Sequence, residues 1–154
     1  MTEFGLEDKI CSLLHTYNIK REAWFGGTKL NGVNCRRLMD KNEDIVSSIK
    51  DIFIAMNKGK VSEQNIDIYC QDHKQILSEM DCAYRCMRTL TITDDLISKT
   101  KYHIENTMIL WRKLKMPVTP SAHLFEDHIL YQMKNIEGGL ADKSEDHIEL
   151  AHQV

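Results

Sequence analysis

Apolar side chains recur every three or four residues along most of the chain, which is the spacing of one face of an α-helix. The first such stripe runs from Gly5 to Tyr17, and Asn18 is placed to end it. The longest stripe begins at Ser62 and continues to about Leu90, which is roughly 40 Å at 1.5 Å per residue. The pattern therefore predicts a long central helix over residues 62–90.

Residues that favour helix ends divide the rest of the pattern. Asn42 and Thr93 each precede an apolar stripe and are expected to cap a helix. Thr119 is followed by Pro120, and proline is favoured at the first helical position. Six or seven helices follow from these signals. They are expected at residues 5–17, 34–40, 43–57, 62–90, 94–116 and 120–135, with a last helix running to the chain end.

The composition agrees with an all-α fold. The chain has 154 residues, of which 42% are hydrophobic and 28% charged, as in a soluble protein with one buried core. It holds only two prolines and seven glycines, too few for the many tight turns of an all-β fold. We expect residues 1–154 to form a single irregular helical bundle, either a whole protein or a piece of a larger one.

The net charge and the cysteine content limit the binding partners and the cellular compartment to be expected. The net charge is −3, so the chain as a whole is not a binder of polyanions. Five cysteines, an odd number, and an acidic N-terminal stretch unlike a signal peptide favour reduced thiols in a nuclear or cytoplasmic protein. No apolar run approaches the ~18 residues that a membrane span needs.

Three of the cysteines lie on the expected long helix. Cys82 and Cys86 are one turn apart and, with Cys70 and His73, offer ligands for a soft metal. The alternative is that these thiols are buried as small apolar groups.

A basic segment between residues 18 and 39 is the first candidate binding site. Its five cations and one acid give a local net charge of +4, and it contains the aromatic pair Trp24 and Phe25. Such a segment would hold phosphate and stack a base. Alternatively, the two aromatic residues fill the core and the cations face water. The candidate nucleic-acid-binding residues are Lys20, Arg21, Trp24, Lys29, Arg36 and Arg37.

Histidines and carboxylates gather between residues 119 and 152. On the helix expected at 120–135, His123, Asp127 and Tyr131 share one face, whereas His128 lies about 100° round from Asp127. On the last helix, Glu145, Glu149 and His152 share a face.

The spacing Glu149-x-x-His152 is one that helical bundles use to hold divalent metals. If the two helices are antiparallel, their polar faces meet. Imidazole and carboxylate together suit Zn, Mn or Fe, and carboxylates alone suit Mg. The alternative is that both faces are simply solvated. The candidate metal ligands are His123, Asp127, Glu145, Glu149 and His152.

The same region carries a resemblance. Its order Thr-Pro-Ser-Ala-His-Leu-Phe-Glu-Asp-His, then Gly-Gly-Leu, then Ser-Glu-x3-Glu-x2-His resembles the C-terminal region of uncharacterised open reading frames carried by DNA transposons of protists and invertebrates. A weaker similarity reaches upstream to Ile10. The chain departs at 141–143, where those frames have glycine and apolar residues. The matching positions are Thr119, Pro120, His123, Glu126, Asp127, His128, Gly139, Glu145, Glu149 and His152.

The resemblance implies a transposase-like or accessory protein. RNase H-type transposases use three carboxylates and two divalent ions, and Glu145 or Glu149 would correspond to the last acid. The strands that carry the first two acids are not predicted here. Two function classes follow. The first is a helical module from a mobile element that binds nucleic acid, a protein partner or itself without catalysis. The second is a divalent-metal site at the C-terminal helix pair, either the remnant of an RNase H-type transposase acid or the site of a metal-dependent hydrolase.

Overall fold

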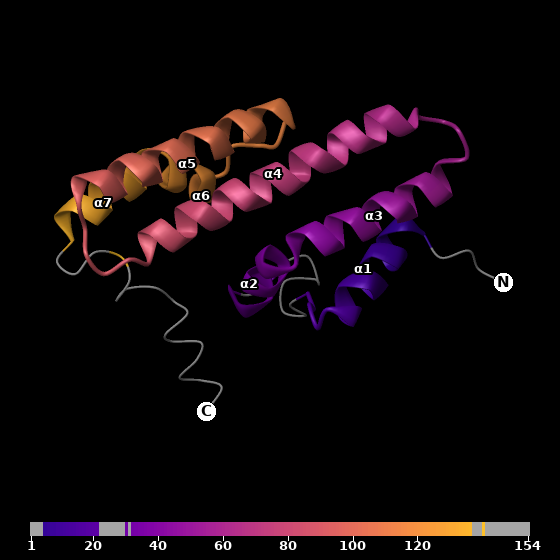
Figure 1. Ribbon diagram of the computed structural model, residues 1–154, viewed down its shortest axis with the longest axis horizontal. Helices are drawn as coiled ribbons and strands as arrows, with labels where there is room; N and C mark the ends of the chain where they lie inside the picture. The colour runs from indigo at the N-terminus through magenta and orange to yellow at the C-terminus, as the bar shows by residue number, and fades with distance from the viewer. Residues whose placement is uncertain (1–4, 22–29, 31, 137–139, 141–154) are drawn as a thin grey trace. The chain divides into compact units, whose positions relative to one another are not determined.

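The computed structural model describes residues 5–21, 30, 32–136 and 140, and over these residues the chain forms helices and turns without a strand (Figure 1). The all-α prediction is therefore confirmed. Three of the elements, α6, η2 and α7, follow one another without a break and form one helical rod. The elements are α1 (Leu6–Thr16), α2 (Gly32–Asp40), α3 (Asn42–Asn57), α4 (Glu63–Met87), α5 (Asp94–Lys113), α6 (Pro120–His123), the π-helical turn η2 (Leu124–His128) and α7 (Ile129–Asn135).

Most helix ends lie where the capping residues predict them. The Thr93 hydroxyl accepts a hydrogen bond from the Leu96 N–H at the start of α5. Thr119 does the same for Ala122, and Pro120 is the first residue of α6. Each cap satisfies an N–H group that the first turn of a helix leaves without an intrahelical partner.

The prediction that Asn42 caps α3 is wrong. Lys41 occupies the cap position, and Asn42 is the first helical residue, with a buried side chain. The Asn42 amide nitrogen instead donates to the Lys74 carbonyl oxygen at 2.8 Å. Its role is thus to join α3 to α4, a long-range contact that a local capping pattern does not reveal.

The chain divides into two compact units, the first ending at Lys74 and the second beginning at Gln75. In the first unit, α3 and the first half of α4 run antiparallel, as the contacts from Asn42 to Lys74 and from Lys50 to Asp67 show. Helix α1 packs beside α3 (Figure 1). The buried apolar residues of this unit are Ile19, Ile45, Val46, Ile66 and Cys70.

In the second unit, α5 packs against both the second half of α4 and the rod α6–η2–α7. Ala83, Ile104 and Met108 are almost fully buried, and Trp111, Phe125, Ile129 and Leu130 pack against them. His103 of α5 lies 2.6 Å from a Glu79 carboxylate oxygen of α4. Arg112 of α5 donates to both oxygens of Glu126 in η2 at 2.7 Å, which anchors the π turn to α5.

Candidate functional site

The three described arginines of the basic segment are bonded within the chain. Arg21 donates to Glu7 at 2.8 Å and to the Cys11 sulfur at 2.9 Å. The bond to Glu7, followed by the charge of Cys11, raises the pKa of Arg21. Arg36 pairs with Asp40 at 3.0 Å, and Arg37 donates to the Asn18 carbonyl at 2.9 Å.

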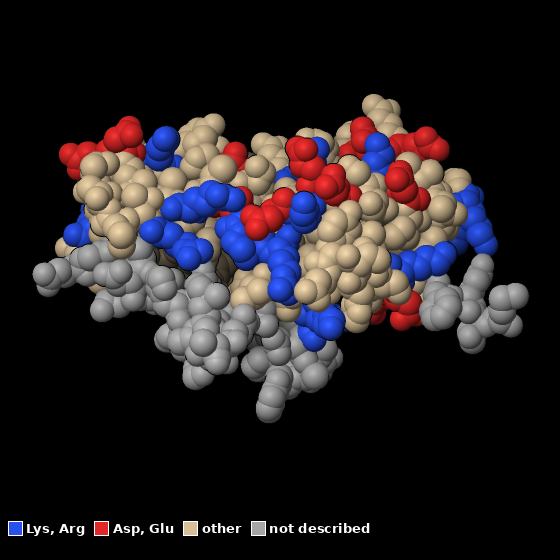
Figure 2. Space-filling model, turned by 60° about the horizontal axis from the view of Figure 1, so that its bottom comes forward, with Lys and Arg blue, Asp and Glu red and all other residues tan. Residues whose placement is uncertain are grey.

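The bond from Arg37 to Asn18 ties together the two ends of the segment. Lys20 joins through its backbone: its carbonyl accepts from the buried Asn34 amide at 2.8 Å. Trp24 and Lys29 lie outside the described residues. On the face drawn in Figure 2, Lys and Arg side chains lie beside Asp and Glu side chains at several places. Each of the three described arginines in the segment therefore has an acceptor within the chain.

The C-terminal candidate site is described in part. His123 Nδ1 lies 2.7 Å from an Asp127 carboxylate oxygen, so these two predicted ligands do share a face. Glu145, Glu149 and His152 lie outside the described residues. Among the residues that are described, no group of three or more His, Cys, Asp or Glu side chains is arranged to hold a metal ion.

The structure also places His128 next to His123, contrary to the expectation of separate lines. Their rings have centroids 5.1 Å apart, and the two Nε2 atoms are 3.4 Å apart. The cause is the π turn over Leu124–His128, which changes the angular position of residues along the rod. Helical periodicity assumes 3.6 residues per turn and cannot show such a turn.

All five cysteines are free thiols, and Cys70 is buried. Burial is the main cause that raises the pKa of the Cys70 thiol, and likewise that of Cys82, where Glu79 and Asp81 add to the effect. A raised pKa keeps a thiol protonated at neutral pH and disfavours its use as a metal ligand or nucleophile.

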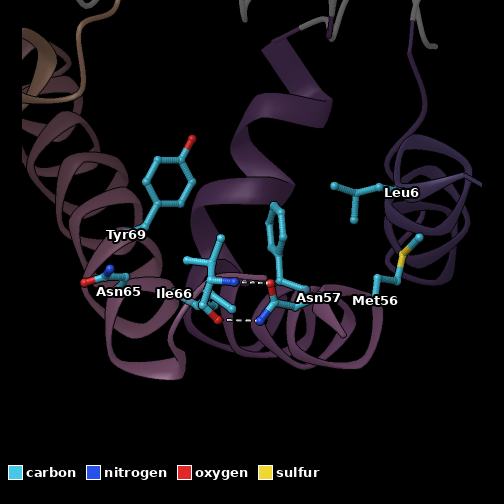
Figure 3. Close-up of a pocket in the computed structure, with 8 residues that line it drawn as sticks. Leu6, Met56, Asn57, Asn65, Ile66 and Tyr69 are labelled. Atoms are coloured by element: carbon cyan, nitrogen blue, oxygen red, sulfur yellow. Dashed lines mark hydrogen bonds between the residues drawn. The ribbon is translucent and has the colours of Figure 1, made fainter. Parts of the chain in front are cut away.

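An apolar groove in the first unit is a candidate site that the sequence patterns do not indicate. It has a volume of about 550 Å³, within the range of small-ligand and side-chain pockets. Figure 3 shows side chains from α1, α3 and α4 around it. The residues that line it are Leu6, Phe53, Met56, Asn57, Val61, Asn65, Ile66 and Tyr69.

The groove exists because apolar faces of α1, α3 and α4 lie next to one another and no further described element covers them. Val61 and Tyr69 keep about half of their surface exposed, at 48% and 52%. The Asn57 amide group is bonded through both its nitrogen and its oxygen to the Val61 backbone, which fixes the turn below the groove (Figure 3). The stripes are readable in the sequence, but which stripe remains uncovered depends on how the helices pack.

No protein-family model, no curated protein and no solved structure matches this chain. Among the described helices, none has both the length and the apolar composition needed to cross a lipid bilayer.

Proposed function

We propose that this chain is a helical binding module, derived from a mobile element, that holds a partner protein and does not catalyse a reaction on its own. The partner segment we assign is an amphipathic helix whose apolar face enters the groove of the first unit and whose polar face is acidic. The observation that carries the proposal is the apolar groove between α1, α3 and α4.

The lining of the groove supports a protein segment as its occupant. None of the eight lining side chains carries a charge, and the Asn57 amide is already bonded to the chain itself. A phosphate backbone would find no cation in this lining. Leu, Phe or Met side chains spaced along one face of a helix would fill it, which is a recurring mode of peptide recognition. Met56 suits such contact because its side chain adapts to different shapes.

The charge of the turn beside the groove supports an acidic partner. The turn between α3 and α4 carries Lys58 and Lys60, both exposed. The residues from Asn57 to Ser62 include no acid. Opposite charge on the partner would speed its approach and orient it over the apolar contact.

Two further features support the proposed origin and cellular compartment of the protein. The resemblance of the region from Thr119 onward to transposon-encoded frames is the support for a mobile-element origin. The five free thiols support a nuclear or cytoplasmic location, where thiols stay reduced. Binding of nucleic acid by the basic segment is the alternative, but Arg21, Arg36 and Arg37 are less available to phosphate because each is bonded within the chain.

The proposal is tested with two synthetic amphipathic helical peptides that share a leucine face, one with glutamate and one with lysine on its polar face. We expect isothermal titration calorimetry to show tighter binding of the glutamate peptide. Tyr69→Ala should weaken that binding at least fivefold. Tyr102→Ala is the matched control, because Tyr102 is similarly exposed, at 59%, but lies on α5 outside the groove. Charge reversal by Lys58→Glu/Lys60→Glu should make the lysine peptide the better ligand.

Two results would overturn the proposal. One is equal loss of peptide binding in Tyr69→Ala and Tyr102→Ala, which would mean non-specific adhesion. The other is the absence of peptide binding together with a salt-sensitive gel shift of duplex DNA that Arg36→Ala/Arg37→Ala abolishes. That second pattern would establish the nucleic-acid alternative instead.

A further inference from the structure

The π turn over Leu124–His128 changes which side chains meet on the rod α6–η2–α7. In a regular α-helix, residues five apart point about 140° away from each other. A π turn has i→i+5 hydrogen bonds and more residues per turn, so residues five apart point in much closer directions than in an α-helix. His123 and His128 are five apart and flank this turn, and their rings are consequently in contact.

The two imidazoles are spaced as ligands of one ion would be. Their Nε2 atoms are 3.4 Å apart, closer than the ring centroids at 5.1 Å, so these nitrogens lie on the facing sides of the rings. Two nitrogens at about 2.0–2.1 Å from a tetrahedral ion are themselves about 3.3–3.4 Å apart. The separation of the two Nε2 atoms is therefore that of two nitrogen ligands of one tetrahedral ion.

Asp127 prepares His123 for this role. Its carboxylate lies 2.7 Å from Nδ1 of His123 and accepts the proton of that nitrogen. The tautomer this favours leaves Nε2 of His123 without a proton, so that it accepts from Nε2 of His128 at 3.4 Å, and a metal ion would take the place of that proton. The neighbouring Glu126 is paired with Arg112, which holds the π turn in place on α5. Both histidines are exposed, so core packing does not account for their contact.

We propose that His123 and His128 form a two-imidazole site for a borderline first-row divalent ion of the Zn²⁺ class, with Asp127 as a positioning residue rather than a ligand. Water completes the coordination. The inference does not rest on the proposed function of the groove. The proposed ligands differ from the set expected from sequence. They include His128, and they do not need Glu145, Glu149 or His152.

The experiment is a titration of the full chain with Zn²⁺ by calorimetry, with Mg²⁺ as a second metal. We expect one Zn²⁺ site and no Mg²⁺ binding, because imidazole suits zinc and magnesium prefers oxygen ligands. His123→Ala and His128→Ala should each abolish the site. Asp127→Ala should weaken it about 10- to 100-fold, as loss of an orienting carboxylate typically does. His15→Ala, an exposed histidine on α1, is the matched control and should bind Zn²⁺ like the parent.

A second readout reports the ligand atoms directly. In long-range ¹H–¹⁵N spectra, Zn²⁺ should shift the Nε2 signals of His123 and His128 and leave Nδ1 of His123 protonated. The variant Glu149→Ala/His152→Ala should retain this response. Loss of zinc binding in that variant, with full binding in His128→Ala, would overturn the inference and favour the C-terminal ligand set. Absence of Zn²⁺ binding by the parent chain would also overturn it.

Discussion

At the scale of the residue, the buried amide side chain of Asn34 holds the connection after α1 in place. Asn34 is 7% exposed, and its side chain bonds both the carbonyl and the N–H of Lys20, at 2.8 and 3.4 Å. This pairing holds the end of the α1 connection against α2 and keeps Ile19 in the core, where it is 1% exposed. Asn18, with a positive φ of 58°, makes the bend that allows the approach.

Replacing Asn34 with alanine should therefore destabilise the first unit. The backbone groups of Lys20 would lose their partner, which costs about 1–3 kcal/mol when the groups stay away from water. Urea unfolding followed by circular dichroism measures the change. Asn135→Ala is the control and should change the free energy of unfolding by less than about 0.5 kcal/mol, because Asn135 is exposed. Equal effects of the two substitutions would contradict the role given to Asn34.

At the scale of the element, the second unit is organised by one face of α5. Met108 is 2% exposed and belongs to the cluster with Ala83 and Ile104, whereas its neighbour Ile109 is 65% exposed. The exposure of these two adjacent apolar side chains thus differs because they point to different sides of α5. The π turn serves this packing as well, since it brings Phe125 and Ile129 against the same cluster.

This difference predicts contrasting effects of two neighbouring substitutions. Met108→Ala should lower the free energy of unfolding by about 2–5 kcal/mol, because it leaves a cavity in the core. Ile109→Ala should change it by no more than about 0.5 kcal/mol. Thermal and denaturant unfolding of both variants, with the parent chain alongside, measures the contrast. A loss above 2 kcal/mol for Ile109→Ala would show that this face of α5 is covered in the folded protein.

At the scale of the whole molecule, several groups hold their protons more tightly in the folded chain than they ordinarily do. Burial raises the pKa of Cys70 and Cys82 from an ordinary value of 9.0, and hydrogen bonds to Asp67 and Glu7 raise the pKa of Lys50 and Arg21. A raised folded pKa contributes stability that is present below the unfolded pKa and lost as the pH rises through the folded value.

The stability of the chain should consequently fall as the pH rises through about 9, where the thiols of the unfolded chain ionise. Denaturant unfolding at intervals between pH 7 and pH 10.5 measures the slope. Cys70→Ala/Cys82→Ala should flatten the curve between pH 9 and 10 relative to the parent. Cys11→Ala, which removes a partly exposed thiol, is the comparison variant. A parent curve that rises with pH over this interval would contradict the assignment.

The sequence alone determined the local structure of this protein. The helical stripes, the caps at Thr93 and Thr119 and the stop after Asn57 each depend on residues within one or two turns of each other. Such short-range preferences act before any packing, so periodicity and end signals locate the helices well. The contact of His123 with Asp127 agrees with the shared face that the i, i+4 spacing predicts.

Only the tertiary structure decided which surfaces are covered and where a helix departs from regular spacing. Asn42 joins α3 to α4 instead of capping, the groove remains open at Tyr69, and the π turn brings His128 to His123. Each of these depends on contacts between residues far apart in the sequence, such as Arg112 with Glu126. A stripe specifies that a face is apolar, but burial of that face depends on the neighbour that packs against it.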